Sequence, residues 1–276
     1  MDSSDLLFIK ELIGSNATSE KGLISLPSGE YVFIKSAKSA PSDFYQVEER
    51  GISYLAETNT VLVPKVFYVS SRGIALEYIE PKSPTRLAAE NFGIELANLH
   101  RHNEEIFGGQ EDGYIGSLPM KNTQTKVFAD FYRECRLMPF LKMAKDKDSI
   151  RASDISSIEE LCNIMEDIVD KNTVPSRIHG DLWSGNVIWR ESQVVLIDPS
   201  AHNGHREADI AMLHLFGAPF LDVIVASYNS VYPLESSWKQ RLSLHQIYYL
   251  LVHAVLFGGS YGHDAGSAGR NALSQI

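Results

Sequence analysis

The residues most suited to chemistry in this chain lie between residues 178 and 198. The segment IHGDLWSGNV contains Asp181 and, five residues later, Asn186. Asp198 follows twelve residues after Asn186, at the end of the apolar run VVLI. Phosphoryl transfer from ATP uses these groups in this order: a carboxylate that orients a hydroxyl nucleophile, then an amide and a second carboxylate that bind Mg²⁺. The spacing predicts Asp181 as the catalytic base and Asn186 and Asp198 as metal ligands.

The residues around these side chains predict how the chain brings them together. Gly180 and Gly185 allow tight backbone turns beside charged groups. After Asn186, the apolar runs VIW and VVLI flank residues 190–193, a pattern that predicts a β-hairpin. Such a hairpin brings Asp198 back to the side of Asn186. Carboxylates gathered there repel one another, and a hard, oxygen-seeking Mg²⁺ ion relieves that repulsion.

A lysine and a glutamate in the first part of the chain suit a nucleotide site. Lys35 ends the β-prone run YVFIK, and Glu48 lies on a helix predicted to start at the N-cap Asp43. In kinases a strand lysine contacts the ATP phosphates and a helix glutamate holds that lysine in place. We expect Lys35 and Glu48 to form this pair. Glu49 is the competing partner, and a solvated surface pair is the alternative.

Two further segments are candidates for nucleotide contacts. We expect residues 14–19, which include Asn16, to cover the phosphates with backbone amides and short hydroxyls, although a plain surface turn is the alternative. No P-loop pattern GxxxxGK[ST] occurs in the sequence. Glu77, Tyr78 and Ile79 precede a change from strand-rich to helix-rich sequence. They are predicted to form a hinge that offers backbone groups to adenine, but an ordinary interdomain strand would use the same residues.

Candidate acceptor-binding residues lie in or after the segment IHGDLWSGNV (178–187), which we call the catalytic segment. Trp183 is suited to stacking on a sugar face, and a core or rim position is the alternative. The run GHREAD, which follows Asp198, contains Arg206, Glu207 and Asp209. We expect Asp209 to brace the catalytic loop. Arg206 and Glu207 suit either bracing ion pairs or contacts with a polar acceptor.

The pattern of elements predicts an α+β protein with two lobes. Residues 1–80 contain β-prone runs separated by Pro/Gly turns, with one predicted helix, and residues 81–276 are mostly helical. The helices predicted in the second part cover residues 85–101, 126–145 with a break at Pro139, 156–171 from a capping box at Ser156 and Glu159, 209–232 and 237–257. We expect a nucleotide-binding lobe over residues 1–80 and a catalytic and acceptor-binding lobe over residues 81–276.

Composition limits the partners. The net charge of −10 argues against nucleic acid and anionic membranes as partners, because both attract basic patches. The N-terminal MDSSD has neither the basic nor the apolar stretch of a signal peptide, and the apolar segment 244–257 is too short to span a bilayer. Two cysteines, Cys135 and Cys162, are too few for a disulfide framework or a zinc site. We expect a cytoplasmic protein.

The run HGDLWSGNV resembles the fructosamine kinase (ketosamine-3-kinase) family, a protein-kinase-like branch close to the aminoglycoside phosphotransferases. The segments FYRECRL (131–137), GHREADIAM (204–212) and LLVHAVLFGGSY (250–261) look like the same family. The resemblance implies a two-lobed protein-kinase-like fold and transfer of the ATP γ-phosphate, with Mg²⁺, to the 3-hydroxyl of a small or protein-bound ketosamine. The unstable product sheds its sugar, which implies a deglycation role.

Two departures from the family pattern bear on the acceptor. Met120 stands where the family usually shows glutamine, and Val252 stands where asparagine is common. If both lie near the acceptor, they affect the preferred sugar.

Some family members carry a redox-sensitive cysteine in the phosphate-covering loop, whereas this chain has none between residues 14 and 22. We therefore expect a monomer.

Two other functions stay open at this stage. One is a kinase for an aminoglycoside, choline or another small alcohol, and the other is a catalytically silent nucleotide-binding protein. The intact set of Lys35, Asp181, Asn186 and Asp198 argues against a silent protein.

Overall fold

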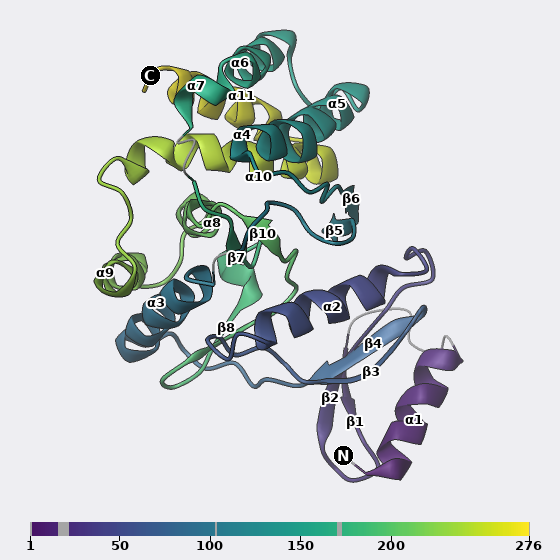
Figure 1. Cartoon of the computed structure of the whole chain (residues 1–276). Coiled ribbons are helices and arrows are strands. Elements are labelled where there is room, and N and C mark those ends of the chain that lie inside the picture. Colours follow the sequence, from purple (N-terminus) through teal and green to yellow (C-terminus); the bar gives the residue numbers. More distant parts are fainter. Residues whose placement is uncertain (1, 16–21, 103, 170–172, 276) are drawn as a thin grey trace.

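The computed structural model describes residues 2–15, 22–102, 104–169 and 173–275 of the chain. A smaller lobe holds a β-sheet and two helices, and a larger lobe is rich in helices (Figure 1). The short strands β7, β8 and β10 lie between the small sheet and the helices around α10 (Figure 1). The change from strands to helices falls between Glu77 and Arg86, a segment that includes the predicted boundary at residue 80.

A four-stranded antiparallel sheet in the order β1-β2-β4-β3 forms the centre of the small lobe. Its strands are β1 (Gly22–Ser25), β2 (Tyr31–Ser36), β3 (Val66–Ser70) and β4 (Gly73–Glu77). The two predicted hairpins, β1–β2 and β3–β4, are confirmed. Helix α2 (Phe44–Ala56) starts after Asp43 as predicted, but the Asp43 side chain makes no capping hydrogen bond. It accepts one from the Tyr114 hydroxyl instead, at 2.8 Å.

The prediction of a single helix in this lobe is wrong, because α1 (Ser3–Gly14) is a second one. Its start is a capping box: the Asp2 carboxylate accepts from the backbone of Ser4 and Asp5, and the Asp5 carboxylate accepts from the Asp2 backbone. Ile9 and Ile13 of α1 are buried in a cluster with the sheet. The acidic run MDSSD therefore contains a helix-start pattern.

The larger lobe begins with α3 and continues through short strands and helices. The elements up to the catalytic segment are α3 (Arg86–His100), β5 (Gly113–Ile115), β6 (Leu118–Met120), α4 (Phe128–Phe131), a π-helical turn (Tyr132–Leu137), α5 (Met138–Asp146), α6 (Ala152–Asn163), α7 (Met165–Ile168) and β7 (Ser176–Ile178). A 3₁₀ turn (Ser184–Asn186), β8 (Val187–Trp189), β9 (Val194–Leu196), β10 (His202–Gly204), α8 (Glu207–Phe216), α9 (Leu221–Val231), a 3₁₀ turn (Trp238–Arg241), α10 (Leu242–Phe257) and α11 (Tyr261–Leu273) follow.

Two helix predictions in this lobe need correction, and one helix was missed. The helix predicted over 209–232 is two helices. Gly217 and Phe220 lie between α8 and α9 at φ 73° and 55°, and these positive values interrupt the right-handed helical backbone. The capping box at Ser156 is wrong: α6 begins four residues earlier, and the Ser156 hydroxyl bonds back to the Ala152 carbonyl at 3.1 Å. Helix α11 was not predicted.

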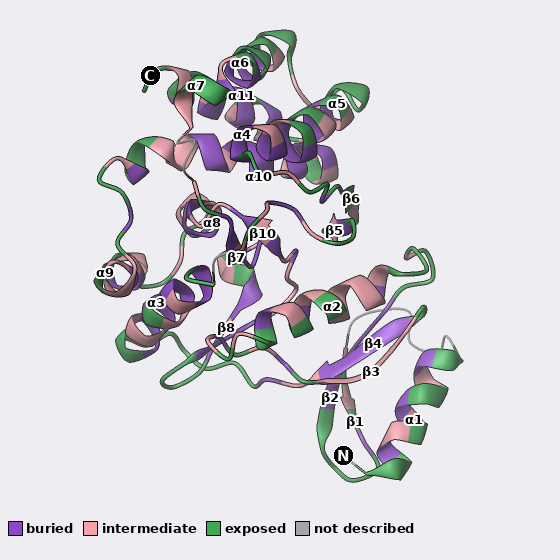
Figure 2. Cartoon of the chain, in the orientation of Figure 1, coloured by how far each residue is buried: buried purple, intermediate pink, exposed green. Residues whose placement is uncertain are grey.

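Helix α10 forms the centre of the larger lobe's core. Ten of its sixteen residues are buried (Figure 2), and it packs against α5, α8 and α11. Met120 and Val252 belong to the same buried cluster, so neither is exposed to a ligand. The Tyr248 hydroxyl donates to the Met120 sulfur at 3.3 Å. Among the described helices, none is both long enough and apolar enough to cross a membrane.

Candidate active site

Two antiparallel pairings bring the catalytic segment together. Strand β7 pairs with β10, with Ile178 opposite His202, and β8 pairs with β9 in the predicted hairpin. The Ile197 backbone N–H donates to the Asn186 carbonyl at 3.1 Å. Residues 181, 186 and 198 therefore lie together at the open end of the β8–β9 hairpin, which we call the catalytic mouth. The hairpin prediction is confirmed.

Asp181 and Asn186 are in direct contact. The Asn186 side-chain nitrogen donates to the Asp181 carbonyl at 2.9 Å and to its carboxylate Oδ2 at 3.1 Å. Burial raises the pKa of Asp181 to about 7, and the charge of Asp198 adds to this, while the hydrogen bond from Asn186 opposes it. The contact leaves the Asn186 amide oxygen turned away from Asp181, where it is suited to ligate a cation.

The backbone on both sides of this contact is unusual. Gly180 adopts φ 80°, and a Cβ at this position would lie 2.3 Å from the Ser200 carbonyl oxygen. Asp198 adopts φ 53°, a left-handed conformation that is uncommon for a residue with a side chain. Strained backbone of this kind concentrates at functional sites, because the surrounding structure must hold it.

Lys35 joins the two lobes through a pair of carboxylates. Its ammonium lies 2.5 Å from Glu48 Oε1 and also bonds to Asp198 Oδ1. Burial disfavours the charged ammonium, but the charges of Glu48 and Asp198 outweigh it and raise the pKa of Lys35. Glu49 instead accepts from the Ser53 hydroxyl at 2.9 Å, so the structure pairs Lys35 with Glu48.

Asp209 braces the catalytic segment through hydrogen bonds to its backbone. Its carboxylate is fully buried and accepts the backbone N–H groups of His179 at 2.8 Å and Gly180 at 2.9 Å. His100 Nε2 lies 3.1 Å from the same carboxylate, and His100 Nδ1 lies 2.9 Å from the Tyr228 hydroxyl. Burial alone would raise the pKa of Asp209, but the hydrogen bond and charge of His100 lower it below its usual value. The bracing expected of Asp209 is present.

The donor atoms at the mouth fit a magnesium ion. Asp198 supplies a carboxylate that is 31% exposed, and Asn186 supplies an amide oxygen. Both are hard oxygen ligands of the type Mg²⁺ prefers. Asp198 also raises the pKa of Asp181, which indicates that negative charge is concentrated here.

Comparison with known proteins decides the family. The sequence profile of the fructosamine kinase family matches residues 13–275. A protein of Enterococcus faecium named as a probable ketoamine kinase is 33% identical over 238 residues, which are 83% of either chain. A chloroplastic protein-ribulosamine 3-kinase of Arabidopsis thaliana is 31% identical over 84% of this chain and 73% of its own length. This chain belongs to the fructosamine kinase family.

Solved structures agree with this placement. A Thermobifida fusca structure assigned as a fructosamine-3-kinase superposes with a TM-score of 0.88 at 40% identity, over 92% of this chain and 89% of that one. Choline kinase LicA of Streptococcus pneumoniae gives a TM-score of 0.61 at 16% identity over 98% and 99% of the two chains, which shows a shared fold alone. The kinase class and the protein-kinase-like α+β fold expected from the sequence are confirmed.

The predicted nucleotide segments of this fructosamine kinase family member are only partly described. Glu77 is the last residue of β4, and its carboxylate accepts from the Lys65 backbone at 3.2 Å. Tyr78 places its ring 6.5 Å from that of Tyr31, and Ile79 is buried. Asn16 lies outside the described residues. The hinge and loop roles stay predictions.

Trp183 lies at the surface, two residues after Asp181. Its side chain is 39% exposed, and its ring packs against Phe216 and over Gly185, where a Cβ would lie 2.3 Å from the indole. A rim position is therefore what the structure shows, and an exposed indole there stays compatible with binding a sugar.

Arg206 and Glu207 are occupied by contacts within the larger lobe. The Arg206 guanidinium donates to the carbonyls of Tyr232 at 3.1 Å and Pro233 at 2.8 Å. Glu207 is 2% exposed and forms two hydrogen bonds with Arg241, at 2.8 and 2.5 Å. These contacts favour the bracing alternative for both residues, and their role toward an acceptor has no support in the geometry.

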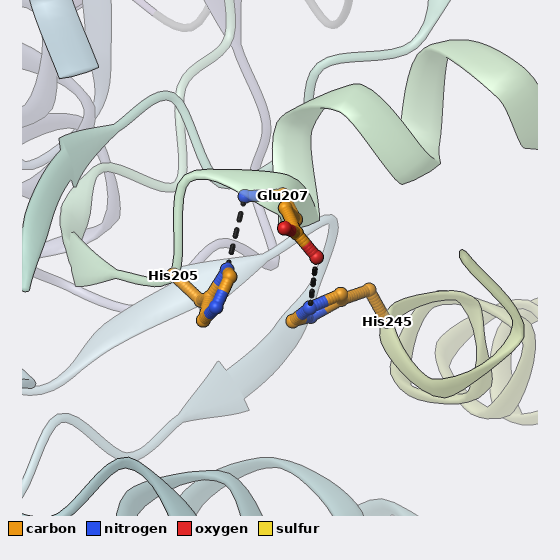
Figure 3. Close-up of side chains that lie close together, drawn as sticks. All are labelled: His205, Glu207 and His245. Carbon is orange, nitrogen blue, oxygen red and sulfur yellow. Dashed lines mark hydrogen bonds and ion pairs between the residues drawn. The ribbon is translucent and has the colours of Figure 1, made fainter. Parts of the chain in front are cut away.

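Figure 3 shows His205, Glu207 and His245 turned toward one another. Each residue offers one possible ligand atom, and these atoms lie within 4.8 Å of one another. They lie on the wall of a cavity of about 370 Å³. Glu207 is already neutralised by Arg241, so a divalent cation would add charge beside an arginine. The arrangement suits a buried ion pair packed against the neutral imidazole of His205, since burial lowers the pKa of His205 well below its usual value.

The contribution of His100 was missed. His100 ends α3, and it also links Tyr228 to Asp209. Its partners are 128 and 109 residues away in the sequence, so no local spacing reports them.

Proposed function

We propose that this protein is an ATP- and Mg²⁺-dependent ketosamine 3-kinase with a deglycation role. The observation that carries the proposal is the mouth where Asp181 meets Asn186 and where Lys35 joins Glu48 to Asp198, in a chain of the fructosamine kinase family. The acceptor class comes from relatives named ketoamine kinase and protein-ribulosamine 3-kinase.

Each of these residues has a separate role in the proposed reaction. Asp181 accepts a hydrogen bond from the acceptor's 3-hydroxyl, orients its oxygen toward the γ-phosphorus and takes the hydroxyl proton late in the transfer. The oxygen–phosphorus bond forms as the bond to ADP breaks. Lys35, held by Glu48, contacts the phosphates. Asn186 and Asp198 would hold Mg²⁺, which neutralises phosphate charge when bound.

The nucleotide contacts assigned to Asn16, Glu77, Tyr78 and Ile79 belong to this proposal, as does acceptor stacking on Trp183. A monomer in the cytoplasm is proposed as well. It is supported by the acidic chain and by the buried state of both cysteines, which precludes a surface thiol link through either.

The deciding experiment is an acceptor panel with purified protein. ATP consumption is measured with ribulosyl-, erythrulosyl- and fructosyl-lysine, and with choline and an aminoglycoside as controls. We expect turnover of a ketosamine, and a loss of about 10²–10⁴-fold in kcat for Asp181→Asn with nucleotide affinity retained. Turnover of a control alone would transfer the protein to a neighbouring branch of the fold. An Asp181→Asn variant with the wild-type kcat would refute the assignment of the base.

A further inference from the structure

Aromatic side chains form a continuous strip that starts in the catalytic segment and leads away from it. The ring of Trp183 lies 6.1 Å from that of Phe216, and Phe216 lies 4.7 Å from His253, measured between centroids. His253 in turn lies 5.4 Å from Phe257 and 5.1 Å from Tyr261. These are the separations of packed aromatic rings. We refer to the five residues as the aromatic strip.

Both ends of the aromatic strip are open to solvent. Trp183 is 39% exposed and Phe257 is 67% exposed, while the three rings between them are partly buried. After Phe257 the chain turns through Gly258 and Gly259, at φ 69° and 65°, so this turn carries no side chain that covers the phenyl ring. Contiguous exposed apolar side chains, unlike scattered ones, mark binding surfaces.

His253 gives the aromatic strip a hydrogen-bond acceptor. Its Nδ1 lies 2.8 Å from the Tyr249 carbonyl oxygen, which only accepts, so Nδ1 carries the proton. Burial lowers the pKa of His253, which keeps the ring neutral near pH 7. In this tautomer Nε2 is an acceptor, and among the described residues none donates a hydrogen bond to it.

The chemistry of a ketosamine matches this surface. Its reacting hydroxyl must lie at Asp181, two residues before Trp183, so the rest of the molecule extends from that point. Its secondary amine is protonated near neutral pH, and ammonium groups bind the faces of aromatic rings and donate to neutral imidazole nitrogens. The alkyl chain attached to the amine is apolar and suits exposed phenyl and phenol rings.

We propose that the far end of the aromatic strip is the subsite for the amine side of the acceptor. The protonated amine lies at His253, and its alkyl chain, such as a lysine side chain, lies on Phe257 and Tyr261. The assignment rests on the proposed ketosamine kinase function. It makes the enzyme selective for what the sugar is attached to, and it leaves room for a protein-bound lysine because the strip ends at the surface.

Two acceptors with the same ketose test the subsite: a ketosyl-lysine, and the 1-amino-1-deoxyketose that has the amine without a side chain. Phe257→Ala removes an exposed ring. We expect it to raise KM for the lysine-linked acceptor roughly fourfold to fifteenfold, the effect of exposing one or two buried methylene groups, with KM for the short amine and for ATP unchanged. His253→Phe keeps a ring without the acceptor nitrogen and should raise KM for both amines. Phe220→Ala, 41% exposed on the same lobe, is the matched control and should change neither.

The outcomes separate the subsite from the function it rests on. A wild-type protein that phosphorylates no ketosamine overturns the proposed function itself. Wild-type turnover with an unchanged acceptor KM in Phe257→Ala and His253→Phe overturns the subsite alone. If Phe257→Ala changes the mass in sedimentation but not KM, Phe257 serves contact between two copies, and the subsite is equally refuted. Should His253→Phe fail to fold, Phe257→Leu, which keeps apolar area without a ring, is expected to recover part of the KM loss.

Discussion

Asp209→Asn is the substitution that most directly tests how the catalytic segment is held. Asp209 Oδ2 accepts from the His179 backbone at 2.8 Å and from His100 at 3.1 Å, and Oδ1 accepts from the Gly180 backbone at 2.9 Å. Asparagine keeps one oxygen and replaces the other with a donor. In its better orientation it keeps the bonds at Oδ2 and turns its NH₂ toward the Gly180 N–H, which loses its partner.

The cost follows from these contacts. An unsatisfied buried N–H costs about 1–3 kcal/mol, and the two surviving bonds each lose about 1 kcal/mol when their acceptor becomes neutral. The variant should therefore be about 3–5 kcal/mol less stable, with Tm lowered by roughly 6–20 °C for a chain of this size. Because Gly180 directly precedes Asp181, kcat should also fall while KM for ATP changes little.

The assay is thermal unfolding together with steady-state kinetics. Asp146→Asn is the control, because Asp146 is 58% exposed and pairs only with Lys142 one helical turn away among the described residues. That pair is worth little, so the control should match the wild type. An Asp209→Asn protein with unchanged Tm and kcat would refute the bracing role.

Three further substitutions test other parts of the structure. Gly180→Ala places a Cβ 2.3 Å from the Ser200 carbonyl oxygen at φ 80°, so we expect loss of soluble, active protein, measured by expression and Tm. Burial raises the pKa of Glu95 to about 7, above its ordinary 4.5. The folded state therefore binds a proton more tightly than the unfolded state, and stability falls as pH rises from about 4.5 through 7. Glu95→Gln should raise Tm at pH 8 by about 2 °C and change it little at pH 5. Arg241→Met leaves the buried Glu207 carboxylate without its bidentate partner and should cost about 3–5 kcal/mol in urea unfolding, whereas an unchanged midpoint would show that the pair contributes nothing.

The predictable parts of this protein are those written in local spacing. The hairpin that returns Asp198 to Asn186 follows from two short apolar runs and a polar turn, and the structure contains it. Lys35 and Glu48 were identifiable because Lys35 lies near the end of a strand and Glu48 lies on the next helix. In both cases a few neighbouring residues carry the whole pattern.

The missed parts depend on backbone geometry or on distant partners. The break between α8 and α9 needs positive φ at Gly217 and Phe220, and a phenylalanine gives no warning of it. Helix α11 is rich in glycine and alanine, and it is stabilised by packing: Gly262 and Gly266 lie so close to Ser149 and Asp154 that a Cβ would overlap them. Poor intrinsic propensity hides such a helix from sequence reasoning.

Charge is the reason why we expect the proposed site to bind Mg·ATP better than free ATP. The Lys35 ammonium is paired with the carboxylates of both Glu48 and Asp198, and the charge of Asp198 reaches Asp181 strongly enough to raise its pKa. An unaccompanied triphosphate would bring further negative charge to these acids. Asp198 and Asn186 would hold a divalent cation there, and its charge would offset that repulsion and leave the Lys35 ammonium available to the phosphates. Nucleotide affinity should therefore rise with Mg²⁺ concentration, and Asp198→Ala should abolish that dependence.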